Sequence, residues 1–210
     1  MNKNDMKTII LLLFCCCMMS LHASPKTRET SSSLEKKILI ITPEANVTSN
    51  YYSLDMIAEE LNIGQDSVGS RFNGIVTEMA ECDPIFVVLN GKSTVVEELL
   101  KNIKVVEQPE KVSVADLSGV SEQDFKNLIR ETGVDYVLVI NGYFLNKQEQ
   151  PFNTIFHTIS FSMYDKNKKS ILTDTNSYNT IALNSCEKIK EASKKCTKRM
   201  VKNILKEVSK

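Results

Sequence analysis

Runs of consecutive apolar residues alternate with stretches of helical spacing along most of the chain. Three runs are rich in valine, isoleucine and leucine, which is typical of strands buried on both faces; they are 37–43, 85–89 and 134–140. Apolar residues three and four apart predict helices over 54–61, 68–79, 95–100 and 121–132. The chain therefore alternates predicted strands and helices as far as residue 140.

The last third of the chain predicts a long hairpin followed by a helix. Apolar and polar residues alternate over 155–163, 165–169 is a polar loop, and 170–182 returns as a more polar strand. Asn184 is the expected N-cap of a final helix whose apolar stripe continues to Val208.

Two local signals refine this pattern. Ser121 followed by Asp124 resembles a capping box, and Gly133 is a natural residue just past a helix end. Asn141-Gly142 interrupts a strand pattern, and we interpret it as a bulge within one long strand.

The order of elements predicts an α/β or α+β fold, with a mixed sheet and helices packed on it. We expect one domain over 36–210, with a C-terminal hairpin and a long closing helix. Residues 24–35 are polar and without periodicity, which is typical of a flexible linker.

The first 23 residues predict an export signal. Lys3 and Lys7 precede an uncharged apolar run, 9–19, and Ala23 offers a small residue for cleavage. The run is too short to span a bilayer, which takes about 20 residues. We expect an exported protein, periplasmic or associated with the outer envelope, without a transmembrane segment after cleavage.

Cysteines bear on both anchoring and redox state. Cys15, Cys16 and Cys17 would permit a lipid anchor, but Phe14 stands where a lipoprotein peptidase prefers a small residue, so we favour plain export. After export the remaining cysteines are Cys82, Cys186 and Cys196. One disulfide is possible in an oxidising compartment, yet we favour three small buried thiols. Cys186 and Cys196 are ten residues apart in one helix, about 15 Å, which is too far to bridge.

Residues 131–139 read Glu-Thr-Gly-Val-Asp-Tyr-Val-Leu-Val and resemble a recurring bacterial envelope module. In that module a helix ends in Gly-Ala-Asp-Tyr-Val-Leu, a strand follows, and a hairpin and a last helix close the domain. Similar modules are the N-terminal domain of the Tol beta-propeller protein, the curli-secretion lipoprotein and the lipoprotein activators of penicillin-binding proteins. The resemblance covers the element order of 36–208 and implies a binding module without catalytic residues. The long insert 91–116 and the missing lipobox depart from it.

His157 is the one histidine after residue 23, so a histidine-rich metal site is excluded. A lone histidine on an apolar strand face is more often a hydrogen-bonded core residue, and we favour that interpretation over a catalytic one. Residues 90–94, Asn-Gly-Lys-Ser-Thr, resemble the tail of a phosphate loop, but Phe86 stands where its first glycine belongs. We interpret them as a turn into a helix capped by Ser93 or Thr94.

Three carboxylates, Glu149, Asp165 and Asp174, flank the predicted hairpin and could in principle hydrolyse a glycoside. Turn aspartates are far commoner, and the chain has no tryptophan for a sugar platform. We therefore expect no catalytic residue, no metal and no cofactor.

The final helix is strongly basic, although the whole chain has 26 basic and 26 acidic residues and no net charge. Nucleic acid is an unexpected partner, because the helix has one arginine and no interleaved aromatic residues. A basic interaction face for an anionic envelope component or an acidic protein is the functional interpretation, and a solvated outer face is the simpler one. The face would be formed by Lys190, Lys194, Lys195, Lys198, Arg199 and Lys202.

These observations favour an exported, non-catalytic envelope protein that binds another protein or an envelope component. Two alternatives stay open. One is a hydrolase of unfamiliar type that uses His157 or the hairpin carboxylates. The other is a structural subunit that associates with itself through exposed strand edges.

Overall fold

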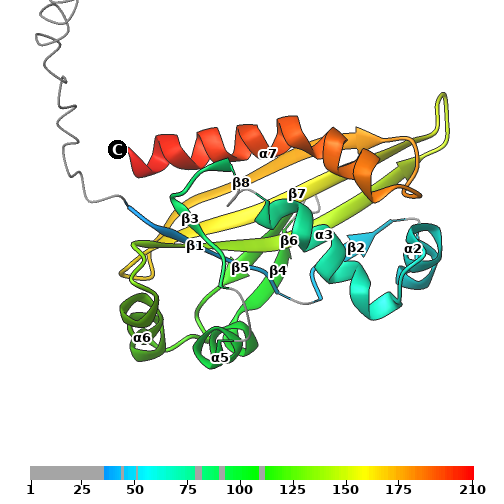
Figure 1. Ribbon diagram of the computed structural model, residues 1–210. Coiled ribbons are helices and arrows are strands. Elements are labelled where there is room, and N and C mark those ends of the chain that lie inside the picture. Colours follow the sequence, from blue (N-terminus) through cyan, green and yellow to red (C-terminus); the bar gives the residue numbers. More distant parts are fainter. Residues whose placement is uncertain (1–35, 44, 51, 79–81, 90–92, 109–111) are drawn as a thin grey trace, which may run out of the picture. The chain divides into compact units, whose positions relative to one another are not determined.

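The centre of the molecule is a six-stranded mixed sheet in the order β3-β1-β6-β7-β8, with β2 also paired to β6 (Figure 1). The computed structural model describes residues 36–43, 45–50, 52–78, 82–89, 93–108 and 112–210. The strands are β1 (Ile38–Ile41), β2 (Val47–Ser49), β3 (Phe86–Val87), β6 (Tyr136–Gln148), β7 (Thr154–Asp165) and β8 (Ser170–Thr180). The predicted leader with its cysteines and the predicted linker lie outside the described residues.

Parallel and antiparallel pairing meet at β6. β1 runs parallel to β3 and to the first half of β6, and all four of its residues are buried. β7 pairs antiparallel with β6 and β8. The predicted α/β fold with a mixed sheet is confirmed, and so is the prediction of a strand buried on both faces.

The predicted bulge in β6 is also confirmed, because the register with β7 shifts between Ile140 and Gly142. A Cβ atom on Gly142 would lie 2.9 Å from Ser113 Oγ and 3.1 Å from Ser113 Cβ. Asn141 Nδ2 donates to the Ser113 carbonyl at 3.0 Å and to Ser162 Oγ at 2.9 Å. The bulge with its glycine therefore lets a neighbouring strand cross closely over the sheet.

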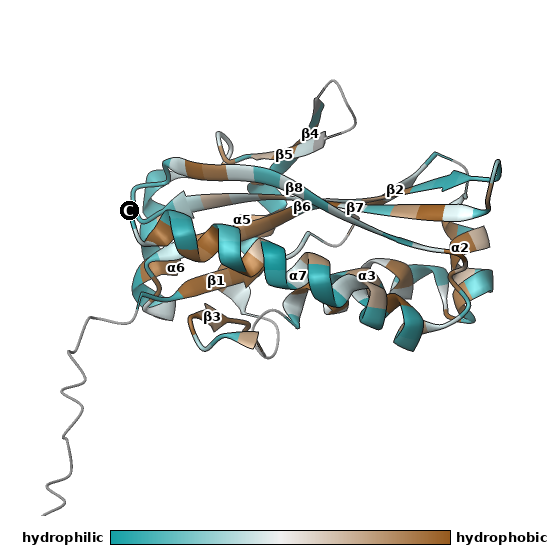
Figure 2. Cartoon of the chain, turned by 90° about the horizontal axis from the view of Figure 1, so that it is seen from above, coloured by the Kyte–Doolittle hydropathy of each residue, from teal (hydrophilic) through white to brown (hydrophobic). Residues whose placement is uncertain are grey.

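That neighbour belongs to a two-stranded antiparallel sheet of β4 (Lys104–Gln108) and β5 (Val112–Asp116). Figure 2 shows this hairpin on the side of the sheet opposite to α7 and α3. Apolar and polar residues alternate only weakly in β5, and the sequence predicted none of β4, β5 and the three-residue β2. The strand expected over 85–89 was too long, since only Phe86–Val87 pairs with β1.

Helices cover both faces of the sheet and divide the core into two clusters. On one face α7 (Cys186–Val208), α3 (Val68–Thr77) and α2 (Leu54–Leu61) pack on the inward side chains of β6 and β7. On the other face α5 (Thr94–Asn102) and α6 (Glu122–Thr132) enclose the alternate residues of β1 and β6. A 3-10 turn, η2 (Gln65–Ser67), leads into α3.

The helix ends follow local chemistry. Ser121 Oγ accepts from the Asp124 backbone N–H at 3.0 Å, and Gly133 closes α6 in the left-handed conformation, so both predictions are confirmed. The predicted N-cap Asn184 is wrong by one residue. Ser185 occupies that position, and its Oγ accepts from the Lys188 N–H at 3.3 Å.

Candidate functional site

His157 lies in the main core, as the core interpretation predicted, and is fully buried. Its Nδ1 is 3.1 Å from the Tyr143 hydroxyl and its Nε2 is 2.8 Å from Thr180 Oγ1. The imidazole stacks on Tyr178 with ring centroids 4.4 Å apart, and the Tyr178 hydroxyl is hydrogen-bonded to that of Tyr143. A neutral imidazole fits this setting, because it offers one donor and one acceptor to two hydroxyl partners.

Burial sets the ionisation of this cluster. It lowers the pKa of His157 to about 3. It raises the pKa of Tyr143 and of Tyr178 well above the ordinary value of a tyrosine, and it also raises that of the Cys196 thiol. At neutral pH all four groups are uncharged, so the cluster holds the core together without offering a proton acceptor to solvent.

The three candidate carboxylates are not brought together. Glu149 lies at the β6–β7 turn and pairs with Lys147 at 3.4 Å. Asp165 lies at the opposite end of the 12-residue strand β7, about 35–40 Å away. Asp174 lies within β8 and binds Asn203 Nδ2 at 3.0 Å. Glycoside hydrolysis needs two carboxyl groups that face each other within about 10 Å. Glu149 is far from Asp165, and the Asp165 carboxylate instead accepts from the N–H groups of Asn167 and Lys169 in the β7–β8 turn.

The turn into α5, possible metal clusters and possible membrane-spanning helices were the remaining candidate features. Ser93 is the N-cap residue of α5, but its side chain makes no capping hydrogen bond, and 90–92 lie outside the described residues. In the part of the chain that the structure describes, no cluster of histidine, cysteine, aspartate or glutamate could hold a metal ion. No helix of that part has the length and apolarity to cross a membrane.

The cysteine interpretation needs correction. Cys82, Cys186 and Cys196 are all free thiols, but only Cys196 is buried, whereas Cys82 is exposed and Cys186 half-buried. Cys82 follows the end of α3 and lies outside the core. The sequence around it did not indicate this exposure.

The basic helix is real, but its six candidate residues divide into two groups. Lys190 Nζ binds Glu78, the C-cap residue of α3, at 2.5 Å. Arg199 donates from Nε to Asn176 Oδ1 at 2.7 Å and from its terminal nitrogen to the Ser177 carbonyl at 2.9 Å. These two cations therefore attach α7 to the domain. Exposed on the outward side of the same helix are Lys194, Lys195, Lys198 and Lys202.

The contacts of Arg199 have a second consequence. β8 is the last strand of the sheet, so its outer backbone groups would otherwise be open to pairing. Arg199 occupies the Ser177 carbonyl, and Asp174 Oδ1 accepts from the Thr175 N–H at 2.8 Å. Side chains thus cover part of this edge and oppose the addition of another strand.

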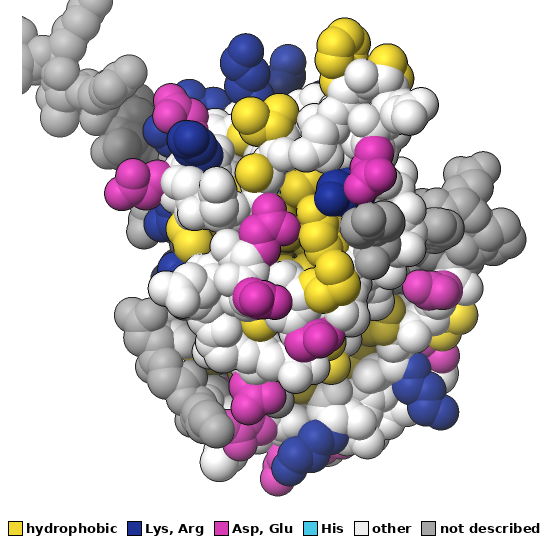
Figure 3. All heavy atoms as spheres, turned by 90° about the vertical axis from the view of Figure 1, so that its right-hand side faces the viewer, with side chains coloured by type: hydrophobic (Ala, Val, Ile, Leu, Met, Phe, Trp, Pro, Cys, Tyr) yellow, Lys and Arg dark blue, Asp and Glu magenta, His cyan; other side chains and the backbone are white. Residues whose placement is uncertain are grey.

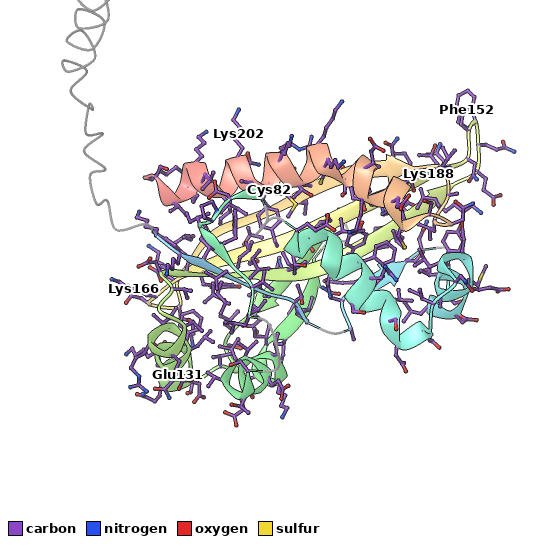
Figure 4. All side chains as sticks on the ribbon, in the orientation of Figure 1. Cys82, Glu131, Phe152, Lys166, Lys188 and Lys202 are labelled. Atoms are coloured by element: carbon purple, nitrogen blue, oxygen red, sulfur yellow. The ribbon has the colours of Figure 1, made fainter. Side chains whose placement is uncertain are left out.

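An exposed apolar surface lies at the opposite end of the domain from the chain's C-terminus. Phe152, in the β6–β7 turn, is 78% exposed, and Ile181, just after β8, is 75% exposed. Asn153 Nδ2 donates to the Ile181 carbonyl at 3.3 Å, which places the two side chains on neighbouring loops. Figure 4 shows Phe152 at the tip of the long hairpin, directed away from the sheet.

Two further exposed apolar residues lie on α2 at this end of the domain, Met56 at 44% and Leu54 at 39% exposed. Glu60 of the same helix accepts from the Leu183 N–H at 3.0 Å, which joins α2 to the loop that carries Ile181. Figure 3 shows hydrophobic side chains gathered in a band on this end, with acidic side chains beside them. We call this surface the end patch; it consists of Leu54, Met56, Phe152 and Ile181.

The lower end of the end patch borders a hollow between α2 and α3. It has a volume of about 370 Å³, and its lining includes the apolar side chains of Leu54, Val47 and Val68 beside Gln65 and Asp66. Sequence reasoning missed the end patch, although an aromatic residue at 152 within the polar segment 149–153 was a signal for it.

Comparisons with known proteins give a likeness of fold at a low level. No protein-family model and no curated protein sequence matches the chain. A solved structure of the hypothetical protein CT253 from Chlamydia trachomatis is 11% identical, with a TM-score of 0.46, and the match covers 80% of this chain and 95% of that one. The LpoB C-terminal domain from Salmonella enterica is 10% identical, with a TM-score of 0.33, over 67% of this chain and 81% of that one.

The lipoprotein activators of penicillin-binding proteins, of which LpoB is one, are among the groups that the sequence pattern suggested. At TM-scores below 0.5, neither likeness indicates a function for this chain. The resemblance to the Tol and curli modules stays a prediction.

Proposed function

We propose that this chain is an exported, non-catalytic protein of the cell envelope whose domain binds a protein partner through the end patch. The observation that carries the proposal is the exposure of Phe152 and Ile181, 78% and 75%, on adjoining loops. Large apolar side chains that protrude together from a domain are typical of an interface centre.

The surroundings of the end patch support this assignment. Hydrogen bonds between side chains and the backbone fix its loops, from Asn153 to the Ile181 carbonyl and from the Leu183 N–H to Glu60. Phe152 and Ile181 themselves protrude from the domain, so a partner could bury them without rearrangement of the core. The hollow beside Leu54 would accept one apolar anchor of that partner. The hydrolase alternative gains no support from the separated carboxylates or from the buried imidazole.

A photocrosslinking experiment tests the proposal. Benzoylphenylalanine in place of Phe152 is expected to trap a discrete protein adduct in intact cells. The matched control is the same group in place of Phe156, which is 37% exposed on β7 and lies outside the end patch. Loss of the adduct in an Ile181→Ser background would tie it to the patch. Equal adducts at both positions, or no adduct at Phe152, would contradict the proposal.

Self-association is a second candidate, favoured by β4. This strand pairs only with β5 among the described residues, and its Val105 and Val106 are 41% and 49% exposed. An open edge with exposed valines can pair with another chain, although Lys104 and Glu107 beside them oppose it. Sedimentation velocity from low to high micromolar concentration tests this. Growth of a dimer that Val106→Lys abolishes would support self-association, and a concentration-independent monomer would exclude it.

A further inference from the structure

The exposed lysines in the second half of α7, from Lys194 on, lie along one side of the helix. They recur at positions that share the outward side, and each of them is exposed. From Lys194 to Lys206 the chain contains no acidic residue. We call this set the lysine row; its members are Lys194, Lys195, Lys198, Lys202 and Lys206.

Unlike Lys190, which forms an ion pair with Glu78, the lysines of the row are not paired with carboxylates in the part of the domain that the structure describes. No ion pair joins Lys194, Lys195, Lys198 or Lys202 to a carboxylate of the described residues. Figure 4 shows Lys202 projecting from the side of α7 that is turned away from the sheet. The row therefore presents its charge directly to whatever lies above the helix.

Charge is segregated across the chain. α7 carries 8 basic and 3 acidic residues, whereas the rest of residues 24–210 carries 16 basic and 22 acidic ones. A domain with this division has no net attraction to a polyanion as a whole, but it is oriented by one, with α7 toward the negative surface. A broad, flat anionic surface matches a straight row better than a compact acidic site does.

The position of the chain's entry into the domain points to a membrane as that surface. Lys36 Nζ donates to the Val208 carbonyl at 2.5 Å, so the first described residue lies at the C-terminal end of α7. The predicted export signal ends at Ala23, and only 24–35 separate it from Lys36. A segment of this length spans at most about 40 Å, so α7 lies within that distance of the bilayer as long as the predicted signal is attached.

We propose that the lysine row docks on anionic phospholipid headgroups, with α7 parallel to the bilayer surface. The apolar side of α7 is occupied by the core, since Ile189, Met200 and Ile204 are buried there, so the contact is electrostatic and no part of the helix inserts. An anionic leaflet attracts each lysine that lies near it, and salt screens the attraction. This surface is separate from the end patch and does not depend on the proposed protein partner.

Vesicle co-sedimentation of the processed protein tests the proposal. The probes are vesicles of phosphatidylcholine with 30 mol% phosphatidylglycerol, and vesicles of phosphatidylcholine alone, both in 0.1 M NaCl. We expect at least tenfold tighter binding to the anionic vesicles, lost in 0.5 M NaCl. Equal binding to both vesicles, or none to the anionic ones, would overturn the proposal.

Charge-reversal variants locate the contact. Lys195→Glu, Lys198→Glu and Lys202→Glu together are expected to weaken anionic vesicle binding at least tenfold. The matched control reverses three exposed lysines elsewhere, Lys126, Lys166 and Lys169, and should stay within twofold of the wild type.

Two further outcomes keep the assignment falsifiable. If the triple glutamate variant unfolds by circular dichroism, the corresponding glutamine variant replaces it and should still lose binding. Equal loss in the control variant would place the contact elsewhere, and binding to polyglutamate without binding to the anionic vesicles would replace the lipid by an acidic polymer.

Discussion

The low pKa of buried His157 should make the folded protein less stable in mild acid. The neutral imidazole is hydrogen-bonded to Tyr143 and Thr180 inside the core, and burial lowers its pKa from 6.5 to about 3. In the unfolded chain the imidazole takes up a proton near pH 6.5. Because the folded pKa is the lower one, the unfolded chain binds a proton that the folded protein does not bind between pH 6.5 and 3. The free energy of unfolding is therefore unaffected by His157 above pH 6.5 and decreases as the pH falls from 6.5 toward 3.

The magnitude follows from the two pKa values. At pH 5 the imidazole is almost fully protonated in the unfolded chain and almost fully neutral in the folded one. The pKa of the unfolded chain, about 6.5, lies about 1.5 pH units above this pH. At roughly 1.4 kcal/mol per unit, proton uptake by the unfolded chain lowers the free energy of unfolding by about 2 kcal/mol. At pH 7.5 the same term is close to zero. A loss of this size is a large part of the stability of an ordinary domain.

Urea denaturation followed by circular dichroism measures the effect at pH 7.5, 6.5, 5.5 and 5.0. The comparison is with His157→Gln, which keeps a polar side chain but does not titrate. The carboxylates are present in both proteins, so their contributions cancel in the difference. We expect the wild type to lose about 2 kcal/mol more than the variant between pH 7.5 and 5.0.

An equal loss in both proteins would refute the reasoning. If His157→Gln does not fold, nuclear magnetic resonance of the wild-type imidazole gives a second test. Its carbon and proton shifts should stay constant from pH 7.5 to about 4. A titration centred near 6.5 would show that the buried ring reaches solvent.

Three further substitutions test the packing of the scaffold by urea denaturation. Gly142→Ala should cost about 1–3 kcal/mol, because its Cβ would lie 2.9 Å from Ser113 Oγ, and Ser113→Gly should restore most of the loss; no rescue would contradict the close approach. Arg199→Ala should lower the free energy of unfolding by about 1 kcal/mol. It should also increase self-association in light scattering, because it uncovers the Ser177 carbonyl on the edge strand β8; unchanged scattering would show that Arg199 does not protect this edge. Ser121→Ala should cost about 1 kcal/mol and slightly more than Ser185→Ala, whose cap bond is longer; the reverse order would argue against the cap geometry.

Local chemistry made much of this fold predictable from sequence. The bulge at 141–142, the Ser121 cap and the long hairpin each rest on signals within a few neighbouring residues. The strand β2 does not, because its three residues are defined by pairing with Tyr143–Leu145, about a hundred positions further along. β4 was missed for a related reason. Its two valines are adjacent, so the segment shows no alternation of apolar and polar residues, and only its pairing with β5 defines it as a strand.

The candidate surfaces show the same division. The sequence identified α7 as basic but could not separate Lys190 and Arg199, which bind α3 and β8, from the outward lysines, because their partners lie far away in the chain. Ile181 continued the pattern of strand 170–182, yet the strand ends at Thr180 and leaves its side chain exposed. Exposure depends on what packs against a residue, and periodicity alone does not contain that information.

The lysine row follows α7 from Lys194 on, and the end patch lies beside the N-terminal end of the same helix. This arrangement determines where the end patch would lie when the lysine row is bound to a membrane. α7 is 23 residues long, about 35 Å, with the chain's entry at Lys36 beside its C-terminal end and the end patch beside its N-terminal end. A domain docked through the lysine row would therefore hold Phe152 beside the membrane surface, away from the tether. A partner bound there would itself be membrane-proximal. Reversal of the lysine row should then reduce crosslinking at Phe152 in cells without changing the affinity of the same partner in detergent solution, because the row supplies position and the end patch supplies the contact.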